Sequence, residues 1–304
     1  MYQGHRKIVS FNQALKIQKR PMNQPHYNEL KDKVVVITGG GGVLGSALAL
    51  SIANQGTKVA ILDLKEEAAQ EIAKKINANG GSAIGVGANV LEKESLIKAR
   101  NIIKEQWGSC DILINGAGGN HPKGTTTKTQ FFEEDLNPPE DLTTFFTLDP
   151  KGIQFVFDLN FIGTLLPTQV FAEDMVGKED TVVLNISSMN AFRPLTKIPA
   201  YSAAKAAVSN FTQWLAVHLA PVGVRVNAIA PGFFLTDQNR SLLTQKDGSL
   251  TPRGNTILEH TPMNRFGEPD DLVGTVLWLM GNGSKFVTGI VVPIDGGFSA
   301  YSGV

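Results

Sequence analysis

Residues 33–45 read KVVVITGGGGVLG, and this stretch decides the fold. The β-branched run predicts a buried strand, and the residues that follow, SALALSIANQG at 46–56, have a helical pattern. Glycines at such a turn let the backbone bend tightly and approach a pyrophosphate, whose charge the free amides at a helix start stabilise. The stretch predicts a phosphate-binding turn. For the glycines alone, a strand-to-helix turn without a ligand stays the alternative.

The next predicted strand ends at Asp63, 25 positions beyond Thr38. A carboxylate at this place can accept hydrogen bonds from the ribose hydroxyls of an adenosine and would repel a 2′-phosphate. The glycine turn holds no Arg or Lys, and Lys65 is the nearby cation. The pattern therefore favours NAD(H) over NADP(H), and a helix-capping role is the alternative for Asp63.

The chain beyond residue 31 alternates short β-branched runs with longer helical patterns, which is typical of βα units. Seven strands with intervening helices predict one doubly wound α/β domain of the Rossmann type, built on a parallel sheet and extending over residues 31–304. The predicted strands are 33–38, 58–63, 82–88, 111–115, 181–187, 224–229 and 289–294, and the predicted helices are 43–55, 65–79, 92–107, 153–176, 200–220 and 269–281.

Two irregular segments interrupt this alternation. Residues 119–150 are polar and rich in Pro, and we interpret them as a substrate loop. Residues 232–265 follow the sixth strand and are predicted to form a lid. Ligands of open α/β sheets bind outside the carboxyl ends of the strands, so these segments are expected to determine substrate specificity.

Composition excludes several classes of function. The 304 residues contain 28 Lys and Arg against 28 Asp and Glu, so no basic field favours nucleic acid as a partner. Cys110 is the single cysteine, and the sequence contains no Cys/His cluster with the spacing of a zinc site, so no metal is expected and a reducing compartment, the cytoplasm, is favoured. No uninterrupted apolar run approaches the roughly 18 residues that cross a bilayer, so no membrane association is expected.

Residues 1–30 are predicted to form a basic leader. The first 28 contain five Lys and Arg and no acid, and they lack the apolar core of a secretory signal. A loosely ordered leader, or a start at Met22, is favoured over an oligomer arm or a basic surface helix.

Tyr201 and Lys205 are four residues apart at the start of the helical pattern YSAAKAAVSNFTQWLAVHL. Both side chains then project from one face, where an ammonium is expected to lower the phenol pKa from its usual value of about 10 toward neutrality. Tyr201 could then exchange a proton with a substrate oxygen near pH 7. Such a pair often arises by chance, but Ser188, 13 residues earlier at the end of VVLNISS, adds a hydroxyl that can hold the same oxygen.

These residues resemble the short-chain dehydrogenase/reductase family over about residues 31–297. Thr38, Gly39 and Gly45 are similar to the family's TGxxxGxG turn, residues 115–118 (NGAG) to its NNAG segment, and 227–232 to its NxxxPG segment. The resemblance implies that Tyr201 is the acid in carbonyl reduction and the base in alcohol oxidation. It also implies that Lys205 lowers the pKa of Tyr201 and binds the nicotinamide ribose, that Ser188 positions the carbonyl, and that Asn160 holds a water linking Lys205 to solvent. The cofactor-binding residues it implies are Gly39, Gly42, Val43, Leu44, Gly45, Asp63, Asn89, Val90, Asn115, Ala117, Gly118, Tyr201, Lys205, Pro231, Gly232 and Thr236.

Three positions depart from the family pattern. Val43 takes the place of a glycine in the turn, Gly116 that of the second asparagine of NNAG, and Asn89 that of an aspartate near the adenine. We expect these changes to affect cofactor affinity, since none removes a group that handles the proton.

Within the family, the loop GAGGNHPKGTT and the tail DGGFSAYSGV resemble the branch of fructuronate reductases, also called D-mannonate oxidoreductases. A sugar acid needs a cation for its carboxylate and polar groups for its hydroxyls. The candidates are Asn120, His121, Lys123 and Arg193, together with Ser188. The predicted reaction is D-fructuronate plus NADH giving D-mannonate plus NAD.

Two alternatives stay open, a polyol or gluconate-type sugar dehydrogenase and a non-catalytic dinucleotide sensor. The apolar faces of the predicted helices 153–176 and 200–220, with the C-terminal segment, indicate a homo-oligomer. The resemblance implies a tetramer.

Overall fold

The computed structural model describes residues 26–236 and 240–303, and β1 (Val34–Thr38) lies at the centre of its sheet. Within these residues seven parallel strands are ordered β3-β2-β1-β4-β5-β6-β7. The order reverses between β1 and β4, which confirms the predicted doubly wound sheet and places a ligand crevice at that point. The other strands are β2 (Lys58–Asp63), β3 (Ser82–Gly87), β4 (Ile112–Asn115), β5 (Thr181–Ile186), β6 (Val224–Pro231) and β7 (Val291–Ile294).

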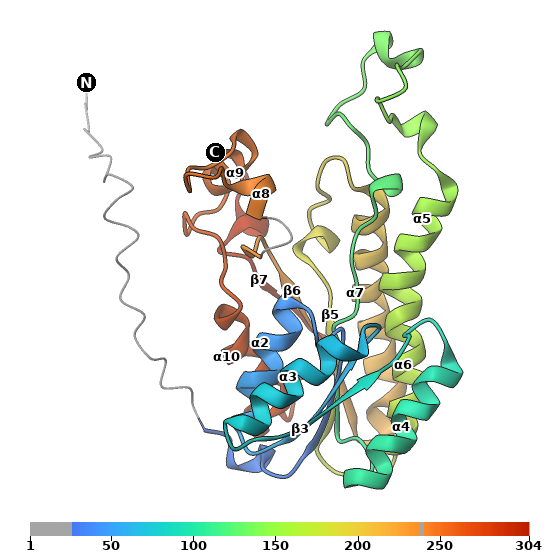
Figure 1. The fold of residues 1–304 in the computed structure, drawn as a ribbon, viewed down its shortest axis with the longest axis vertical. Coiled ribbons are helices and arrows are strands. Elements are labelled where there is room, and N and C mark those ends of the chain that lie inside the picture. Colours follow the sequence, from blue (N-terminus) through green and yellow to red (C-terminus); the bar gives the residue numbers. More distant parts are fainter. Residues whose placement is uncertain (1–25, 237–239, 304) are drawn as a thin grey trace, which may run out of the picture.

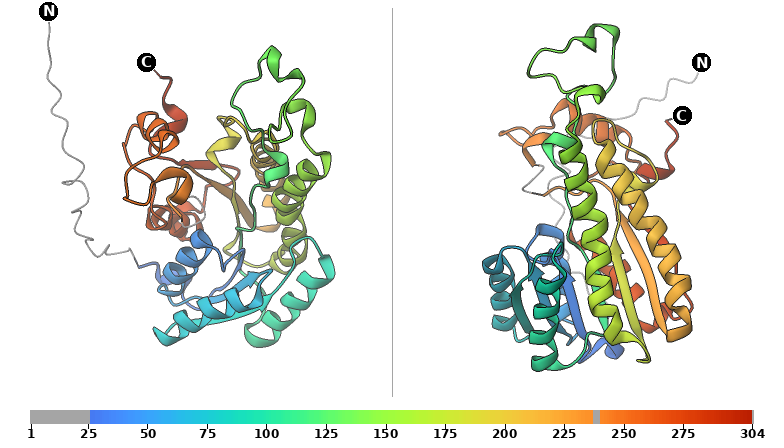
Figure 2. Two further views of the ribbon diagram at one scale, coloured as in Figure 1. Left: turned by 45° about the horizontal axis from the view of Figure 1, so that its top comes forward. Right: turned by 90° about the vertical axis from the view of Figure 1, so that its right-hand side faces the viewer.

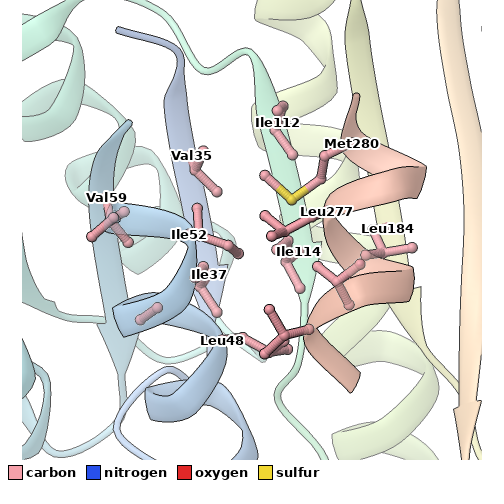
Figure 3. Packing of buried hydrophobic residues seen from close by; sticks show 14 of the residues in the cluster. Val35, Ile37, Leu48, Ile52, Val59, Ile112, Ile114, Leu184, Leu277 and Met280 are labelled. Carbon is pink, nitrogen blue, oxygen red and sulfur yellow. The ribbon is translucent and has the colours of Figure 1, made fainter. Parts of the chain in front are cut away.

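Helices cover both faces of the sheet, because alternate residues of its central strands are apolar on both sides. Val35 and Ile37 of β1 face α2 (Val43–Ala53), α3 (Glu66–Ala78) and α10 (Asp270–Met280). Figure 3 shows this cluster, in which Ile52 and Leu277 lie over β1 and β4. Val34 and Val36 face the opposite layer (Figure 1), formed by α4 (Lys93–Trp107), α6 (Gly163–Ala172) and α7 (Pro199–Leu219).

The helix predicted at 153–176 contains a π-helical turn. The structure has α5 (Pro150–Phe157), the π turn η5 (Asp158–Ile162), α6 and the short η6 (Glu173–Met175) in one continuous helix. Asn160 Nδ2 donates to Val156 O at 2.7 Å, and so takes the carbonyl that the backbone amide of residue 160 would use in an α-helix. The helix is long and apolar enough to cross a membrane, but half of that window is buried inside the fold, so core packing explains its composition.

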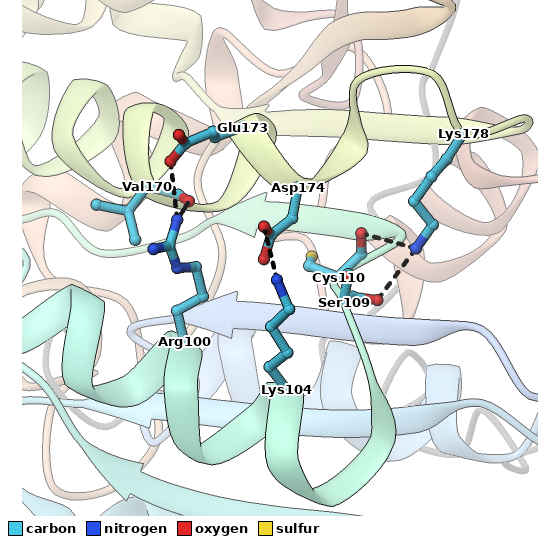
Figure 4. A network of polar contacts seen from close by, with 8 residues as sticks. All are labelled: Arg100, Lys104, Ser109, Cys110, Val170, Glu173, Asp174 and Lys178. Carbon is cyan, nitrogen blue, oxygen red and sulfur yellow. Dashed lines mark hydrogen bonds and ion pairs between the residues drawn. The ribbon is translucent and has the colours of Figure 1, made fainter.

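Ion pairs join α4 to the end of this helix (Figure 4). Arg100 contacts Glu173 at 2.9 Å, and Lys104 contacts Asp174 at 3.3 Å. Lys178 pairs with Asp111 at 2.6 Å and also bonds the carbonyl of Cys110. Such pairs at the surface contribute little energy, so the packing of the buried residues positions the helix that carries Asn160.

The last residues of the predicted leader pack on the domain. The short η1 (Asn28–Leu30) packs on the domain, with Leu30 only 1% exposed. Glu29 Oε1 accepts from Asn282 N at 2.9 Å, and Tyr27 N donates to Gln55 Oε1 at the same distance. The rest of the predicted leader, residues 1–25, lies outside the described part of the chain.

Both irregular segments lie at the carboxyl end of the sheet (Figures 1 and 2). The predicted substrate loop contains the 3-10 turns η2 (Pro122–Gly124), η3 (Glu133–Leu136) and η4 (Phe145–Thr147). The predicted lid contains α8 (Arg240–Leu243) and α9 (Pro252–Glu259). The remaining short turns are η7 (Met189–Ala191), η8 (Ala220–Val222), η9 (Asn282–Ser284) and η10 (Phe298–Ala300).

Candidate active site

A cavity of about 480 Å³ opens where the strand order reverses. The ends of β1, β2, β4, β5 and β6 and the start of α7 contribute to its wall, so segments far apart in sequence meet there. Its lining includes the predicted residues Gly39, Gly42, Val43, Leu44, Gly45, Asp63, Ala117, Gly118, Ser188, Tyr201, Lys205, Pro231, Gly232 and Thr236.

The glycine turn needs glycine at two positions. Gly39 has φ +65°, and a Cβ there would lie 2.8 Å from the backbone of Ala117. A Cβ on Gly45 would overlap Gly39 O. Gly42 caps α2 without a side-chain bond, so the first-turn amides are available to an anion. Val43 begins the helix with no positive φ, so its departure from the family pattern introduces no backbone strain.

Thr38 ties the end of β1 to the segment after β4. Its Oγ1 accepts from Gly116 N at 3.1 Å and from Ala117 N at 3.2 Å. A Cβ on Gly116 would lie 2.7 Å from Thr38 O, so the close approach of the two segments explains the glycine there.

Asp63 lies at the wall of the cavity beside the glycine turn. Its Oδ2 accepts from Gly41 N and its Oδ1 from Lys65 N, each at 3.1 Å. The N-cap of α3 is Lys65, with no side-chain cap, so the helix-cap alternative for Asp63 is wrong. The carboxylate is held in place with lone pairs left for ribose hydroxyls.

Lys205 is nearly fully buried, and its Nζ donates to Ile186 O at 2.7 Å. Burial lowers the pKa of Lys205 to about 8. Its Nζ lies 5.7 Å from the centroid of the Tyr201 ring, so the two predicted partners share one cavity.

The predicted direction of the Tyr201 pKa is wrong for this state of the chain. Burial raises the pKa of the phenol, and a hydrogen bond with Ser188 offsets only part of that rise. The ammonium of Lys205 donates to the carbonyl of Ile186, and burial is the largest cause of the shift in the pKa of Tyr201. Tyr201 is therefore a neutral proton donor at pH 7, as carbonyl reduction requires.

Asn160 lies in the π turn and locks the loop after β4. Its Oδ1 accepts from Gly119 N at 3.2 Å, and its Nδ2 donates to Gly119 O at 2.7 Å. The position of a Cβ on Gly118 would be 2.7 Å from Asn160 Oδ1 and 3.1 Å from Lys205 Nζ. The amide and the ammonium are therefore neighbours, as the family resemblance implies.

Three predicted cofactor residues do not line the cavity. Asn89 bonds locally to Glu92 and Leu91, and Val90 is a buried residue beside Gly163. Asn115 is 1% exposed, and its Nδ2 donates to Thr168 at 2.9 Å and to Asn185 at 2.8 Å. Its side chain therefore joins β4 to β5 and α6.

The predicted substrate residues other than Ser188 also lie outside the cavity. Asn120 Nδ2 donates to Thr125 Oγ1 at 3.0 Å, His121 Nδ1 accepts from Lys123 N at 3.2 Å, and Lys123 Nζ lies 3.5 Å from Asp149. Arg193 is exposed beyond η7. These residues follow the NGAG segment or Ser188 closely in sequence, but they do not line the cavity that contains Tyr201 and Ser188.

Other cavity residues were not singled out from the sequence. Ile186 and Ser187 come just before Ser188, and Phe233 and Phe234 follow the PG of the NxxxPG segment. In the sequence, only their position next to a recognised motif indicates that these four residues could line the site. No group of three His, Cys, Asp or Glu that could hold a metal occurs among the residues the structure describes.

The chain is similar to known proteins in sequence and in fold. Residues 33–247 match the family model described as short chain dehydrogenase. The chain is 57% identical to an uncharacterized oxidoreductase of Haemophilus influenzae over 284 residues, 93% of this chain and 99% of that protein. It is 51% identical to an uncharacterized oxidoreductase, UxuB, of Bacillus subtilis over 281 residues, 92% of this chain and 99% of that protein.

A solved structure extends the comparison to three dimensions. The crystal structure of a Haemophilus influenzae protein, described provisionally as a D-mannonate oxidoreductase and containing bound NAD, has a TM-score of 0.87 to this chain. The two are 55% identical, and the match covers 92% of this chain and 98% of the other. The chain is an oxidoreductase and belongs to the short-chain dehydrogenase family.

Proposed function

We propose that the chain is an NAD(H)-dependent reductase of a sugar acid that converts D-fructuronate and NADH to D-mannonate and NAD. The observation that carries the proposal is the single cavity in which Tyr201, Ser188 and Lys205 meet the glycine turn and Asp63. The solved Haemophilus influenzae structure, with its NAD and its provisional description, supports the cofactor and the substrate.

The residues fit a dinucleotide. A pyrophosphate can approach the backbone closely at Gly39 and Gly45, which have no side chains, and the first-turn amides of α2 can bind it. The carboxylate of Asp63 can accept hydrogen bonds from the two ribose hydroxyls. Pro231, Gly232 and Thr236 line the same cavity, and they are the residues that would bind the nicotinamide. NADH supplies a hydride to the carbonyl carbon when it is bound.

The chain's own residues supply the proton and stabilise the charge. Ser188 holds the carbonyl oxygen while Tyr201 gives that oxygen its hydroxyl proton and becomes a phenolate. The ammonium of Lys205 stabilises the phenolate. The phenolate regains its proton from solvent through Lys205 and a water held at Asn160. In alcohol oxidation the same groups act in reverse, with Tyr201 as the base.

Asp63 is expected to select the cofactor. In Asp63→Asn, the ratio of kcat/KM with NADH to kcat/KM with NADPH should fall by about 10- to 100-fold, because a charged acceptor for the ribose and a repulsion of the 2′-phosphate are lost together. Steady-state kinetics with both cofactors measure the ratio. Asp32→Asn, at an exposed position before β1, is the matched control. An unchanged ratio in Asp63→Asn would show that another group selects NAD(H).

A substrate panel tests the reaction itself. Loss of NADH absorbance is followed with D-fructuronate, 5-keto-D-gluconate and D-fructose, which differ in charge or in the configuration of a hydroxyl-bearing carbon. We expect the highest kcat/KM for D-fructuronate. A preference for D-fructose would refute a sugar acid as the substrate, and a preference for 5-keto-D-gluconate would indicate a gluconate-type enzyme.

Two further features of the proposal concern assembly and compartment. Trp214 is 56% and Val217 is 78% exposed on α7, next to a hollow of about 360 Å³ between α6 and α7. This apolar surface supports the pairing of these helices in a homo-oligomer, and a tetramer is the form we propose. The buried free thiol of Cys110 suits the cytoplasm as the compartment.

A further inference from the structure

A second cavity, of about 390 Å³, adjoins the first. Phe233 lines both cavities, so the two lie next to each other, with this side chain at the wall of each. Its wall combines Thr129 of the predicted substrate loop, residues 195–197 of the segment between β5 and α7, one face of α9, and Phe298 near the C-terminus. Four segments that are far apart in sequence therefore meet in one place.

The second cavity has an uncompensated positive charge. Among the residues that the structure describes, its lining includes Lys197 and Arg253 and no Asp or Glu. Across the described ranges 26–236 and 240–303, neither cation has a carboxylate within ion-pairing distance. Arg265, by contrast, lines a different pocket and is bound by both oxygens of Asp271 at 2.6 and 2.8 Å.

The remaining lining suits a polyhydroxylated chain. His260 Nδ1 lies 2.7 Å from Thr256 O, so the ring donates there and its Nε2 is left for a hydroxyl. Thr129 and Thr196 add further hydroxyls. The rings of Phe233 and Phe298 pack edge to face at 5.3 Å and present an apolar wall for C–H groups.

We propose that Arg253 and Lys197 bind the carboxylate of the substrate in this second cavity while its ketone lies at Tyr201 and Ser188 in the first. The inference rests on the proposed function and replaces His121, Lys123 and Arg193 as the carboxylate-binding residues. In a keto sugar acid whose carboxylate and ketone are separated by several carbons, the two groups need separate sites. Two adjoining cavities that share Phe233 supply them.

The test is Arg253→Gln, compared on D-fructuronate and D-fructose. The kcat/KM for D-fructuronate should fall by about 10- to 100-fold, mainly through KM, because a charged hydrogen-bonding partner of the carboxylate is lost. The kcat/KM for D-fructose should change less than about twofold. Lys197→Gln should give the same selectivity with a smaller loss, and Arg253→Lys should recover part of the activity. Lys246→Gln, an exposed lid position outside the cavity, is the matched control.

The outcomes separate the inference from the function. If the wild-type chain prefers D-fructuronate but Arg253→Gln weakens both substrates equally or neither, the inference is overturned and the function stands. A selective loss in Arg193→Gln or Lys123→Gln in place of Arg253→Gln overturns it as well. If 5-keto-D-gluconate is the preferred substrate and Arg253→Gln weakens it selectively, the proposed function fails and the carboxylate site is supported. If no anionic substrate turns over, both are wrong.

Discussion

Tyr201→Phe is expected to lower kcat by about 10²- to 10⁴-fold and to leave the affinity for NADH nearly unchanged. The substitution keeps the ring, its contacts in the cavity and the helix, and removes only the hydroxyl that gives its proton to the substrate oxygen. The loss is severe because Tyr201 is a neutral donor with a raised pKa, and its hydroxyl is the one that shares a hydrogen bond with Ser188.

Single-turnover and steady-state kinetics with D-fructuronate measure the loss, and a fluorescence titration measures NADH binding. Tyr27→Phe is the matched control, since Tyr27 packs against Gly281, away from the catalytic cavity. Turnover in Tyr201→Phe near the wild-type rate would contradict the mechanism, and loss of NADH binding would show that the hydroxyl acts in binding the cofactor.

The fold could be predicted because its pattern is local. β1 starts one residue after the predicted position, and β2 and the start of α2 agree with the prediction residue for residue. An apolar run that is buried on both faces, followed by glycines that alone fit the turn, permits few other structures. Ser188, Tyr201 and Lys205 could be predicted for the same reason, because each lies in a short motif that can be recognised in the sequence.

The π turn at Asn160 could not be predicted, because its cause lies in another segment. The amide of Asn160 is bound to Gly119, 41 residues away, and to Val156 within its own helix. Helical periodicity reports neither contact. The loop after β4 therefore determines the local helix geometry.

The predicted substrate residues other than Ser188 lie outside the catalytic cavity for a similar reason. His121 and Lys123 lie close in sequence to a recognised motif, whereas Lys197 and Arg253 are 56 residues apart and lie in irregular segments. Their shared cavity arises only when α9 packs near the loop before α7. No periodic pattern encodes such packing.

The pKa values of Tyr201 and Lys205 could not be predicted from the four-residue separation of the two side chains. A separation of four residues predicts that both side chains share a face, and the structure agrees. Burial and the carbonyl of Ile186 are tertiary features, and they set the pKa of each group. The sequence therefore predicts the pair but not the direction of the pKa shift of its phenol.

Lys205→Met is expected to lower kcat by about 10²- to 10³-fold, because the phenolate formed on Tyr201 loses the charge that stabilises it. In the wild-type chain the pKa of Lys205 is about 8, so the ammonium is charged at pH 7 and becomes neutral as the pH rises through that value. The kcat/KM for reduction should therefore fall above pH about 8. This fall should be absent in Lys205→Met, and a profile with the same fall would assign it to another group.

The same substitution should stabilise the fold at neutral pH, which separates a catalytic role of Lys205 from a structural one. Its pKa is lowered from 10.5 to about 8, and each unit corresponds to about 1.4 kcal/mol, so the buried charge destabilises the native state by about 3 kcal/mol at pH 7. Between pH 8 and 10.5 the unfolded chain retains a proton that the native chain has lost, so the free energy of unfolding of the wild type rises with pH relative to that of Lys205→Met. Urea unfolding of both proteins at pH 7 and pH 10 measures this difference. An advantage of the methionine variant that is the same at both pH values would show that Lys205 is not buried as a charge.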